Sequence, residues 1–358
     1  MKPAIRLLSV LIALLAVLTT VSRVYAAEFR SLGDVNGDGA FGTADAVLLQ
    51  KYLLAEPDAV LAYPQAADFD GDGRLSAKDL TRMKRALLCQ AEAASADLPE
   101  CSAAAVLCAE DGLLLYSDRI DEQIAPASLT KLLTALTALQ YLDPETVITV
   151  GTEQSLVKPH SSLCLIKPGH RLRLRDLLTG MLVASGNDAA YTVAAAAARA
   201  AYPSKSMSDS EAADCFAAMM NAFAAKLHMT HSHFVSPEGW DDPAQYTTAA
   251  DLLTLAQRAY ENPVIREIVG TAQTRIVFVS GENVTWKNTN LLLDPASSYY
   301  CAEAGGMKTG TTAQAGHCLI AAFRRNGKTY FTLAAGCRTG SARYVLTGQL
   351  LGKIPPLI

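Results

Sequence analysis

Two short segments of the chain place a serine three residues ahead of a lysine. In APASLTKLLTALTALQ (residues 125–140) the pair is Ser128 and Lys131, and in SLVK it is Ser155 and Lys158. A serine hydroxyl is a poor nucleophile until a base takes its proton, and a lysine whose pKa is lowered by burial can be that base. Either pair could therefore carry out nucleophilic catalysis, provided that the fold holds both side chains on one face.

The apolar residues after the first pair predict the element that would hold it. They recur with the spacing of one helix face, at Leu129, Leu132, Leu133, Leu136 and Leu139. Ser128 would then lie at a helix N-terminus, with Lys131 one turn on and on the same face. Pro159 directly follows Lys158 and disfavours helix at that lysine. We therefore retain the first pair and discard the second.

Two triplets elsewhere in the chain add further polar residues. Ser185-Gly186-Asn187 falls between two predicted helices, residues 172–183 and 189–201. Lys308-Thr309-Gly310 lies in a glycine-rich approach to a predicted strand, residues 315–323. Each triplet is a weak signal alone, but the three motifs in this order form a specific pattern.

The order Ser-x-x-Lys, Ser-Gly-Asn, Lys-Thr-Gly resembles that of the serine acyltransferases that recognise penicillin, which include penicillin-binding proteins and serine β-lactamases. Four segments are similar in particular to low-molecular-mass D-alanyl-D-alanine carboxypeptidases: SLTKLLTAL, LVASGNDAA, HFVSPEGWDDPAQYTTAADL and GGMKTGTTAQAGHCLIAAF. The resemblance extends from about residue 101 to residue 351. It implies an α+β fold of the β-lactamase/transpeptidase-like type, with an antiparallel sheet, a helical cluster and a cleft between them.

The activity that the resemblance implies is removal of the terminal D-alanine from peptidoglycan stem peptides, without a catalytic cofactor and with β-lactams as inhibitors. The residue matching the acylated nucleophile of the family is Ser128, and its general base is Lys131. Ser185 would pass a proton to the leaving D-alanine. Asn187 would hydrogen-bond both Lys131 and the substrate amide.

The resemblance also assigns the substrate contacts. Lys308 and Thr309 would hold the terminal carboxylate, and Arg343 matches an arginine near that carboxylate. The backbone amides of Ser128 and Thr311 would form the oxyanion hole. These residue types suit the substrate, because its carboxylate needs cations and its developing oxyanion needs fixed N–H donors.

Two other functions stay open at this point. A serine β-lactamase or a DD-endopeptidase would use the same three motifs, although a class A β-lactamase also needs a Glu-x-x-Leu-Asn segment. Glu211 is followed by AADC and Glu238 by GWDD, so neither fits that segment. An alternative of another class is a non-catalytic, wall-binding adaptor, but the intact motifs favour an enzyme.

The N-terminal part contains an internal repeat, because DVNGDG at residues 34–39 recurs as DFDGDG at residues 68–73. Oxygen-bearing residues at loop positions 1, 3, 5 and 12, with glycine at position 6, are typical of a calcium-binding loop. The repeat therefore predicts two Ca²⁺ ions, with loop-helix units whose helices cover residues 46–54 and 80–88. The predicted ligands are Asp34, Asn36, Asp38, Ala40 and Asp45 in the first loop, and Asp68, Asp70, Asp72, Arg74 and Asp79 in the second. Ala40 and Arg74 would contribute backbone carbonyls.

The duplicated loop, followed by LLQKYLL in its first copy, resembles a type I dockerin domain over about residues 31–90. The resemblance implies a small all-α domain that docks onto a cohesin module. The matching docking positions are Thr43, Ala44, Gln50, Lys51, Ala77, Lys78, Lys84 and Arg85. The two halves differ there, and a calcium-stabilised spacer without a partner is the alternative. Many carboxypeptidases of the family end in a small β-domain and a membrane-gripping helix. We expect neither after residue 351, and we expect the dockerin to provide the tether instead.

Composition and the termini define the remaining expectations. Two basic residues precede an apolar run, so residues 1–26 predict a secretory signal and a secreted, extracellular or wall-associated protein. The dockerin would occupy residues 27–90, a linker 91–100 and the catalytic domain 101–358. A net charge of −4 gives no basic excess for nucleic acid. The eight cysteines are scattered and form no Cys-x-x-Cys, which favours mostly free thiols.

Overall fold

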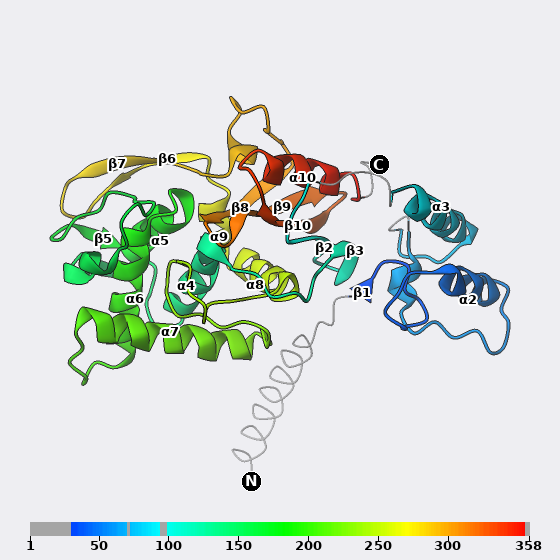
Figure 1. Cartoon of the computed structure of the whole chain (residues 1–358), viewed down its shortest axis with the longest axis horizontal. Helices are drawn as coiled ribbons and strands as arrows, with labels where there is room; N and C mark the ends of the chain where they lie inside the picture. Colours follow the sequence, from blue (N-terminus) through cyan, green and yellow to red (C-terminus); the bar gives the residue numbers. More distant parts are fainter. Residues whose placement is uncertain (1–29, 70–71, 94–98, 355–358) are drawn as a thin grey trace, which may run out of the picture.

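The computed structural model describes residues 30–69, 72–93 and 99–354 (Figure 1). The predicted signal sequence and Asp70 lie outside these residues. Within them, no helix is both long enough and apolar enough to cross a lipid bilayer. The seven cysteines whose side chains are described are all free thiols, as the sequence predicted.

A six-stranded sheet forms the centre of the larger domain, with strand order β1-β3-β2-β10-β9-β8. All its neighbouring strands are antiparallel except β1 and β3, which are parallel. The bounds are β1 Arg30–Ser31, β2 Ala103–Cys108, β3 Leu113–Asp118, β8 Ala304–Thr312, β9 Gly316–Arg325 and β10 Lys328–Cys337. Strand β8 is therefore an edge strand, and one of its sides is free of strand pairing within the described residues.

Helices cover both faces of this sheet. Alternate residues of β2 enter two different apolar clusters, because successive side chains of a strand point to opposite faces. Ala103, Ala105 and Leu107 join the helical cluster, whereas Ala104, Val106 and Cys108 pack with Leu346 and Leu350 of α10 (Ala342–Leu351). A strand buried on both sides explains the continuous apolar run that the sequence shows here.

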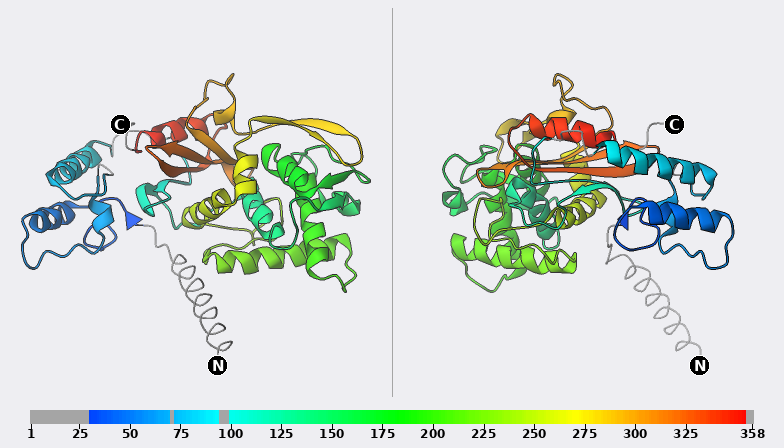
Figure 2. Two further views of the ribbon diagram at one scale, coloured as in Figure 1. Left: turned by 180° about the vertical axis from the view of Figure 1, so that it is seen from behind. Right: turned by 45° about the vertical axis from the view of Figure 1, so that its right-hand side comes forward.

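The helical cluster lies on the face opposite α10 and carries the first two motifs (Figures 1 and 2). It consists of the 3₁₀ turn η2 (Ala127–Thr130), α4 (Lys131–Ala138), α5 (Leu174–Val183), α6 (Asn187–Ala201), α7 (Asp209–Lys226), α8 (Ala249–Glu261) and α9 (Pro263–Val269). Two hairpins flank it, β4 (Val147–Thr149) with β5 (Arg171–Arg173) and β6 (Gln273–Val277) with β7 (Asn283–Lys287). Short 3₁₀ turns η3 (Thr152–Leu156) and η4 (Leu291–Leu293) complete the domain. The predicted α+β class is confirmed.

The N-terminal domain consists of two helices, α2 (Thr43–Leu53) and α3 (Ala77–Ala93), with the 3₁₀ turn η1 (Pro64–Ala67) between them. Its buried apolar residues include Val35, Leu49, Leu61 and Met83, and they belong to the same apolar cluster as the α10 side of the sheet. In both views of Figure 2 this domain lies beside the end of the sheet that is formed by β3 and away from the helical cluster. Its loop-helix repeats agree with the prediction.

Some predicted boundaries are wrong, and each error has a local cause. The Lys-Thr-Gly motif lies inside β8 and not before a strand, because β9 pairs with β8 continuously from Gly306 to Thr312, after a register shift between Ala304 and Gly306. Helix α3 continues to Ala93 and so enters the predicted linker. Helix α7 was not predicted, although Ser208 accepts a hydrogen bond from the Glu211 amide and begins it as an N-cap.

Candidate active site

The serine retained from the sequence lies in a tight turn at the start of α4. Ser128 belongs to η2, and Lys131 is the first residue of α4 and is 0% exposed. Ala127, directly before the serine, has φ +47°, a conformation that is strained for a residue with a side chain. Ser128 Oγ lies 2.7 Å from Lys131 Nζ in a hydrogen bond. By contrast, Ser155 and Lys158 are both exposed, so neither has the buried surroundings of Lys131.

Lys131 connects the nucleophile to two other segments. Its Nζ donates to Oδ1 of Asn187 at 2.8 Å and to the backbone carbonyl of Glu238 at 3.0 Å. Burial lowers the pKa of Lys131 to about 8, against a smaller upward effect of the Glu238 carboxylate. A neutral amine can donate two protons and accept one, so Lys131 in that form can receive the Ser128 hydroxyl proton.

The second and third motifs meet in a separate buried contact. Lys308 Nζ donates to Ser185 Oγ at 2.9 Å and to the carbonyl of Thr309 at 2.9 Å. Burial, followed by the charges of Lys131 and Arg343, lowers the pKa of Lys308 well below its ordinary value. A buried lysine with a depressed pKa next to a hydroxyl can exchange protons with it.

Strained backbone accompanies these two motifs as well. Ser185 has φ +60°, and Met307, the residue before Lys308, has φ +104°. All three predicted motifs therefore contain or directly follow a non-glycine residue with positive φ. Such strain persists only where the surrounding structure over-determines the backbone, and it concentrates at functional sites.

The residues assigned to the substrate carboxylate lie along β8 and beside it. Thr309 Oγ1 is 2.6 Å from Thr289 Oγ1, and either hydroxyl can donate. Arg343 extends from α10, and its Nη1 donates to the Gly310 carbonyl and to Thr311 Oγ1, each at 3.3 Å. The Arg343 guanidinium lies over the Tyr344 ring, 5.1 Å from its centroid. Hydroxyls and a guanidinium at this point can bind a carboxylate.

Two glycines allow the segments of the site to approach one another. A Cβ on Gly310 would lie 3.2 Å from the Ser128 amide nitrogen. Gly239 has φ +87°, and a Cβ there would lie 1.8 Å from the Ala127 carbonyl oxygen. Only glycine therefore fits at residue 239, where the loop that holds Lys131 presses against the turn of the nucleophile.

This geometry agrees with what the chain is similar to. Residues 90–336 match the Peptidase S11 family of D-alanyl-D-alanine carboxypeptidases. The chain belongs to this family. A D-alanyl-D-alanine carboxypeptidase of Streptomyces sp. strain K15 is 34% identical over 230 residues, which are 61% of this chain and 74% of that protein. Carboxypeptidase DacF of Bacillus subtilis is 26% identical over 255 residues, 70% of this chain and 61% of DacF.

The fold of this S11 family member has a solved counterpart. The crystal structure of the Streptomyces K15 DD-transpeptidase superposes with a TM-score of 0.64 at 29% identity, covering 72% of this chain and 98% of that one. This chain spans 61% of DacF of B. subtilis and 57% of DacC of Escherichia coli. At the other end, residues 32–88 match the type I dockerin domain. Both predicted resemblances are confirmed.

Sequence reasoning missed three residues of the S11 site. Glu238 is 1% exposed, its Oε1 accepts from the Tyr191 hydroxyl at 3.2 Å, and its Oε2 has no hydrogen-bond partner among the described residues. Thr289 faces Thr309 as described above. Tyr191 lies one helical turn after Asn187, and that spacing was a signal in the sequence that could have predicted it.

The dockerin loops keep their carboxylates close to the backbone. Asp45 accepts hydrogen bonds from the amides of Val35, Asn36 and Gly42, and Asp79 accepts from Phe69 and Ser76 in the second loop. Among the residues that the structure describes, no three acidic, histidine or cysteine side chains gather into a metal cluster. The oxygen donors predicted from the sequence, four side chains and one carbonyl per loop, are nevertheless the donor type that suits a hard cation such as calcium.

Proposed function

We propose that this protein is a serine-type DD-carboxypeptidase that removes the terminal D-alanine from peptidoglycan stem peptides through an acyl-enzyme on Ser128. The observation that carries the proposal is the pair of lysine–serine contacts across one cleft. Ser128 lies 2.7 Å from Lys131, and Ser185 lies 2.9 Å from Lys308. Family membership supports the substrate class.

Acylation would begin when neutral Lys131 takes the hydroxyl proton of Ser128. The Ser128 oxygen then bonds to the carbonyl carbon before the last D-alanine, and the oxyanion faces the amides of Ser128 and Thr311. Ser185 gives its hydroxyl proton to the leaving amine and regains one from the Lys131 ammonium. The C–N bond breaks, and the net transfer is one proton from Ser128 to D-alanine.

Deacylation would repeat the sequence with water as the nucleophile. Lys131 takes a proton from the water, the C–O bond of the ester breaks and Ser128 recovers its hydroxyl proton. A β-lactam would acylate Ser128 in the same way, because its carboxylate and strained carbonyl match those of the peptide. The Lys308–Thr309–Arg343 group would hold the carboxylate in both cases.

The test uses a fluorescent penicillin and a peptide that ends in D-Ala-D-Ala. We expect a long-lived label on the wild-type chain, release of D-alanine from the peptide, and neither result with Ser128→Ala. Ser155→Ala, in the discarded pair, is the matched control and should keep both activities. Absence of label and release in the wild type would contradict the proposal. Rapid loss of label with penicillin turnover would indicate a β-lactamase.

We also propose that the dockerin binds two calcium ions and docks an exported form of the enzyme onto a cohesin. The first site would use Asp34, Asn36, Asp38, Ala40 and Asp45, and the second Asp68, Asp70, Asp72, Arg74 and Asp79. Exposed Thr43, Ala44, Gln50 and Lys51 on α2 support a docking surface, as do exposed Ala77, Lys78 and Lys84 on α3.

Cohesin capture by the full chain, with calcium and with EDTA, tests this second proposal. Calcium-dependent retention by at least one cohesin of the source organism is the expected result. Lys51→Glu should weaken retention, whereas Asp58→Asn, on the exposed connection after α2, should not. No retention by any cohesin in calcium would overturn the docking proposal and leave the spacer alternative.

A further inference from the structure

Two cysteine residues lie opposite each other at one end of the central sheet. Strands β2 and β10 are antiparallel, and Ala103 pairs with Ala335 where β2 begins. The same register, continued along both segments, brings Cys101 opposite Cys337. The Ser102 amide donates to the Ala335 carbonyl at 2.7 Å, so the two segments stay together beyond the end of the paired strands.

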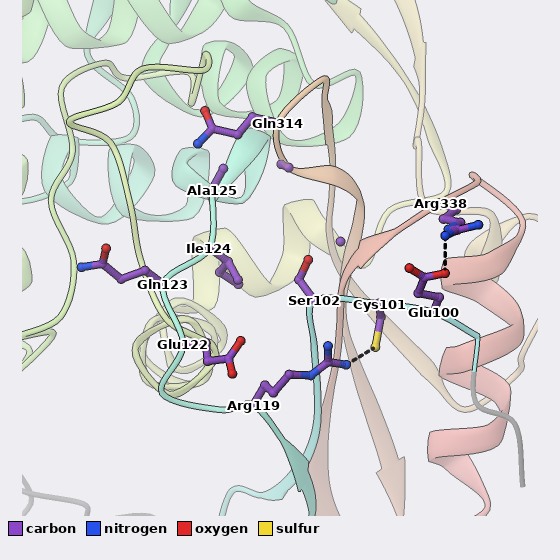
Figure 3. Close-up of a pocket in the computed structure, with 12 residues that line it drawn as sticks. Glu100, Cys101, Ser102, Arg119, Glu122, Gln123, Ile124, Ala125, Gln314 and Arg338 are labelled. Carbon is purple, nitrogen blue, oxygen red and sulfur yellow. Dashed lines mark hydrogen bonds and ion pairs between the residues drawn. The ribbon is translucent and has the colours of Figure 1, made fainter.

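Contacts on both sides of the two cysteines support this register. A Cβ on Gly336 would lie 2.0 Å from Ser102 Oγ, so these two residues lie side by side. On the other side, Glu100 pairs with Arg338 at 2.6 Å (Figure 3). Each cysteine lies between these two contacts, one on each segment.

The two cysteine side chains also lie on the same face of the sheet. Regular alternation would turn both toward the helical cluster, but β10 shifts its register against β9 between Ala334 and Cys337. Cys101 and Cys337 both belong to the apolar cluster on the α10 side, where they are 6% and 0% exposed. Cys318, on β9, belongs to the helical cluster on the other face. Cys101 and Cys337 are therefore the pair that this geometry selects.

We propose that Cys101 and Cys337 form a disulfide that stabilises the catalytic domain. Both are free thiols in this structure. Directly opposite residues of antiparallel strands have Cα atoms about 4.5–5.5 Å apart, within the range of about 4.4–6.8 Å that a disulfide needs. Cys101 follows the predicted linker, so the bond would join the point where the chain enters this domain to the last strand of its sheet. The inference does not depend on the proposed carboxypeptidase activity.

A low-molecular-mass disulfide such as oxidised glutathione would act as the oxidant. The Cys101 thiolate attacks one of its sulfurs, the S–S bond of glutathione disulfide breaks, and a glutathione thiolate leaves. The Cys337 thiolate then attacks Cys101 Sγ in the mixed disulfide and releases the second glutathione. The two protein thiols lose two electrons and two protons, and the two glutathione molecules gain them.

The surroundings of the two sulfurs explain this order of attack. Cys101 lines a polar pocket of about 440 Å³, from which a small disulfide can approach (Figure 3). Asp118 accepts from Nε and Nη2 of Arg119, at 3.2 and 2.7 Å, and so holds the guanidinium beside Cys101. Arg119 Nη2 lies 3.8 Å from Cys101 Sγ, and a guanidinium favours a thiolate.

The second thiol ionises less readily than the first. Burial raises the pKa of Cys101, but the positive charge of Arg119 opposes that rise. Burial, followed by the negative charge of a Cys101 thiolate, raises the pKa of Cys337 to about 12. Formation of the mixed disulfide removes the Cys101 charge and thereby favours the second step.

Refolding of the full chain tests the proposal, because the oxidant then reaches both thiols before the domain buries them. The reduced, urea-unfolded chain is refolded in a mixture of oxidised and reduced glutathione, or in reductant alone. Mass spectrometry of peptides, after free thiols are blocked, should find Cys101 linked to Cys337 only in the first sample. The thermal midpoint of the catalytic domain should be about 5–15 °C higher with the disulfide. The same analysis of native chain incubated with oxidised glutathione repeats the test without refolding.

Cys101→Ala and Cys337→Ala should each lose the linked peptide and the difference between the oxidised and reduced midpoints. Cys215→Ala is the matched control, because Cys215 is a partly buried thiol on α7, and it should keep both. A wild-type chain that refolds with a cooperative thermal transition but keeps both thiols free would overturn the proposal. A Cys101–Cys337 link with equal midpoints would overturn its stabilising role. Neither result depends on whether the variants fold.

Discussion

At the residue scale, the chemistry depends on the surroundings of one buried amine. Lys131 has three hydrogen-bond partners, which come from three separate segments of the chain. Burial favours its neutral form, and that form is the one that can take a proton from Ser128. The charge of the buried Glu238 carboxylate opposes this effect, and the resulting pKa of Lys131 is about 8.

The pH dependence of acylation tests this balance. The rate should rise with pH and level off above about 8, because Lys131 loses its proton with a pKa of about 8. Glu238→Gln removes a negative charge that raises the pKa of Lys131, so the same rise should move to lower pH. The other titratable groups near Lys131 are Asp188, Cys164 and Lys308, which the variant leaves in place. Stopped-flow acylation by penicillin from pH 5 to 10 measures both curves.

Tyr191→Phe is the control, since it removes the hydrogen bond to Glu238 Oε1 and keeps the charge. The acylation rate of this variant should depend on pH in nearly the same way as that of the wild type. An unchanged midpoint in Glu238→Gln would show that the carboxylate does not influence Lys131.

At the scale of elements, the site depends on how closely a loop approaches a helix start. The loop around Gly239 supplies the Glu238 carbonyl to Lys131 and presses against the turn that carries Ser128. A single added methyl group would therefore disturb the base and the nucleophile together.

Gly239→Ala should lower both stability and acylation. The positive φ alone costs about 1–3 kcal/mol in an alanine, and overlap with the Ala127 carbonyl adds to it. Gly169→Ala is the matched control, because Gly169 has φ +93° but no atom within 4 Å of its added Cβ. Thermal midpoints and the rate of penicillin labelling compare the two variants. Equal losses of stability and labelling rate in Gly239→Ala and Gly169→Ala would mean that backbone strain is the cause, and not contact with the turn that carries Ser128.

At the scale of the whole molecule, two modules share one end of the sheet. Strand β1, at the start of the dockerin, pairs with β3, and the Leu32 amide donates to the Leu114 carbonyl at 2.8 Å. The active site lies at the other edge of the sheet, on β8. Four intervening strands therefore separate β1, next to the dockerin, from β8, which carries the Lys-Thr-Gly motif.

Removal of calcium should accordingly unfold the dockerin and leave the activity of the catalytic domain unchanged. The predicted ligands include three carboxylates in the first loop and four in the second, and a bound cation would offset their mutual repulsion. A metal that binds only the folded state stabilises that state by about 2.7 kcal/mol at 100 times its Kd. Calorimetry of the full chain should show one transition that EDTA shifts to lower temperature and one that EDTA leaves unchanged. The rate of penicillin labelling with EDTA should stay within about twofold of the rate with calcium.

Paired Asp45→Asn and Asp79→Asn substitutions should reproduce the effect of EDTA. Asp58→Asn, an exposed position outside the loops, should not. Loss of labelling together with the calcium-sensitive transition would mean that the two modules fold as one unit.

Much of this protein was determined by local sequence. Ser128 and Lys131 are three residues apart, and the residues of each predicted calcium loop are contiguous, so short-range spacing indicated both groups. The helical period after Ser128, Pro159 and the order of the three motifs then selected Ser128 over Ser155. The fold class followed from apolar periodicity and from the resemblance that the motifs carry.

Only the tertiary structure decided what surrounds those motifs. Glu238 is 107 residues from Lys131, and Ser185 is 123 residues from Lys308, so neither contact leaves a periodic trace in the sequence. A polar pocket of the larger domain likewise combines residues 100–125 with residues 314–338. Burial is a property of the assembled core, and burial is the main cause that lowers the pKa of both Lys131 and Lys308.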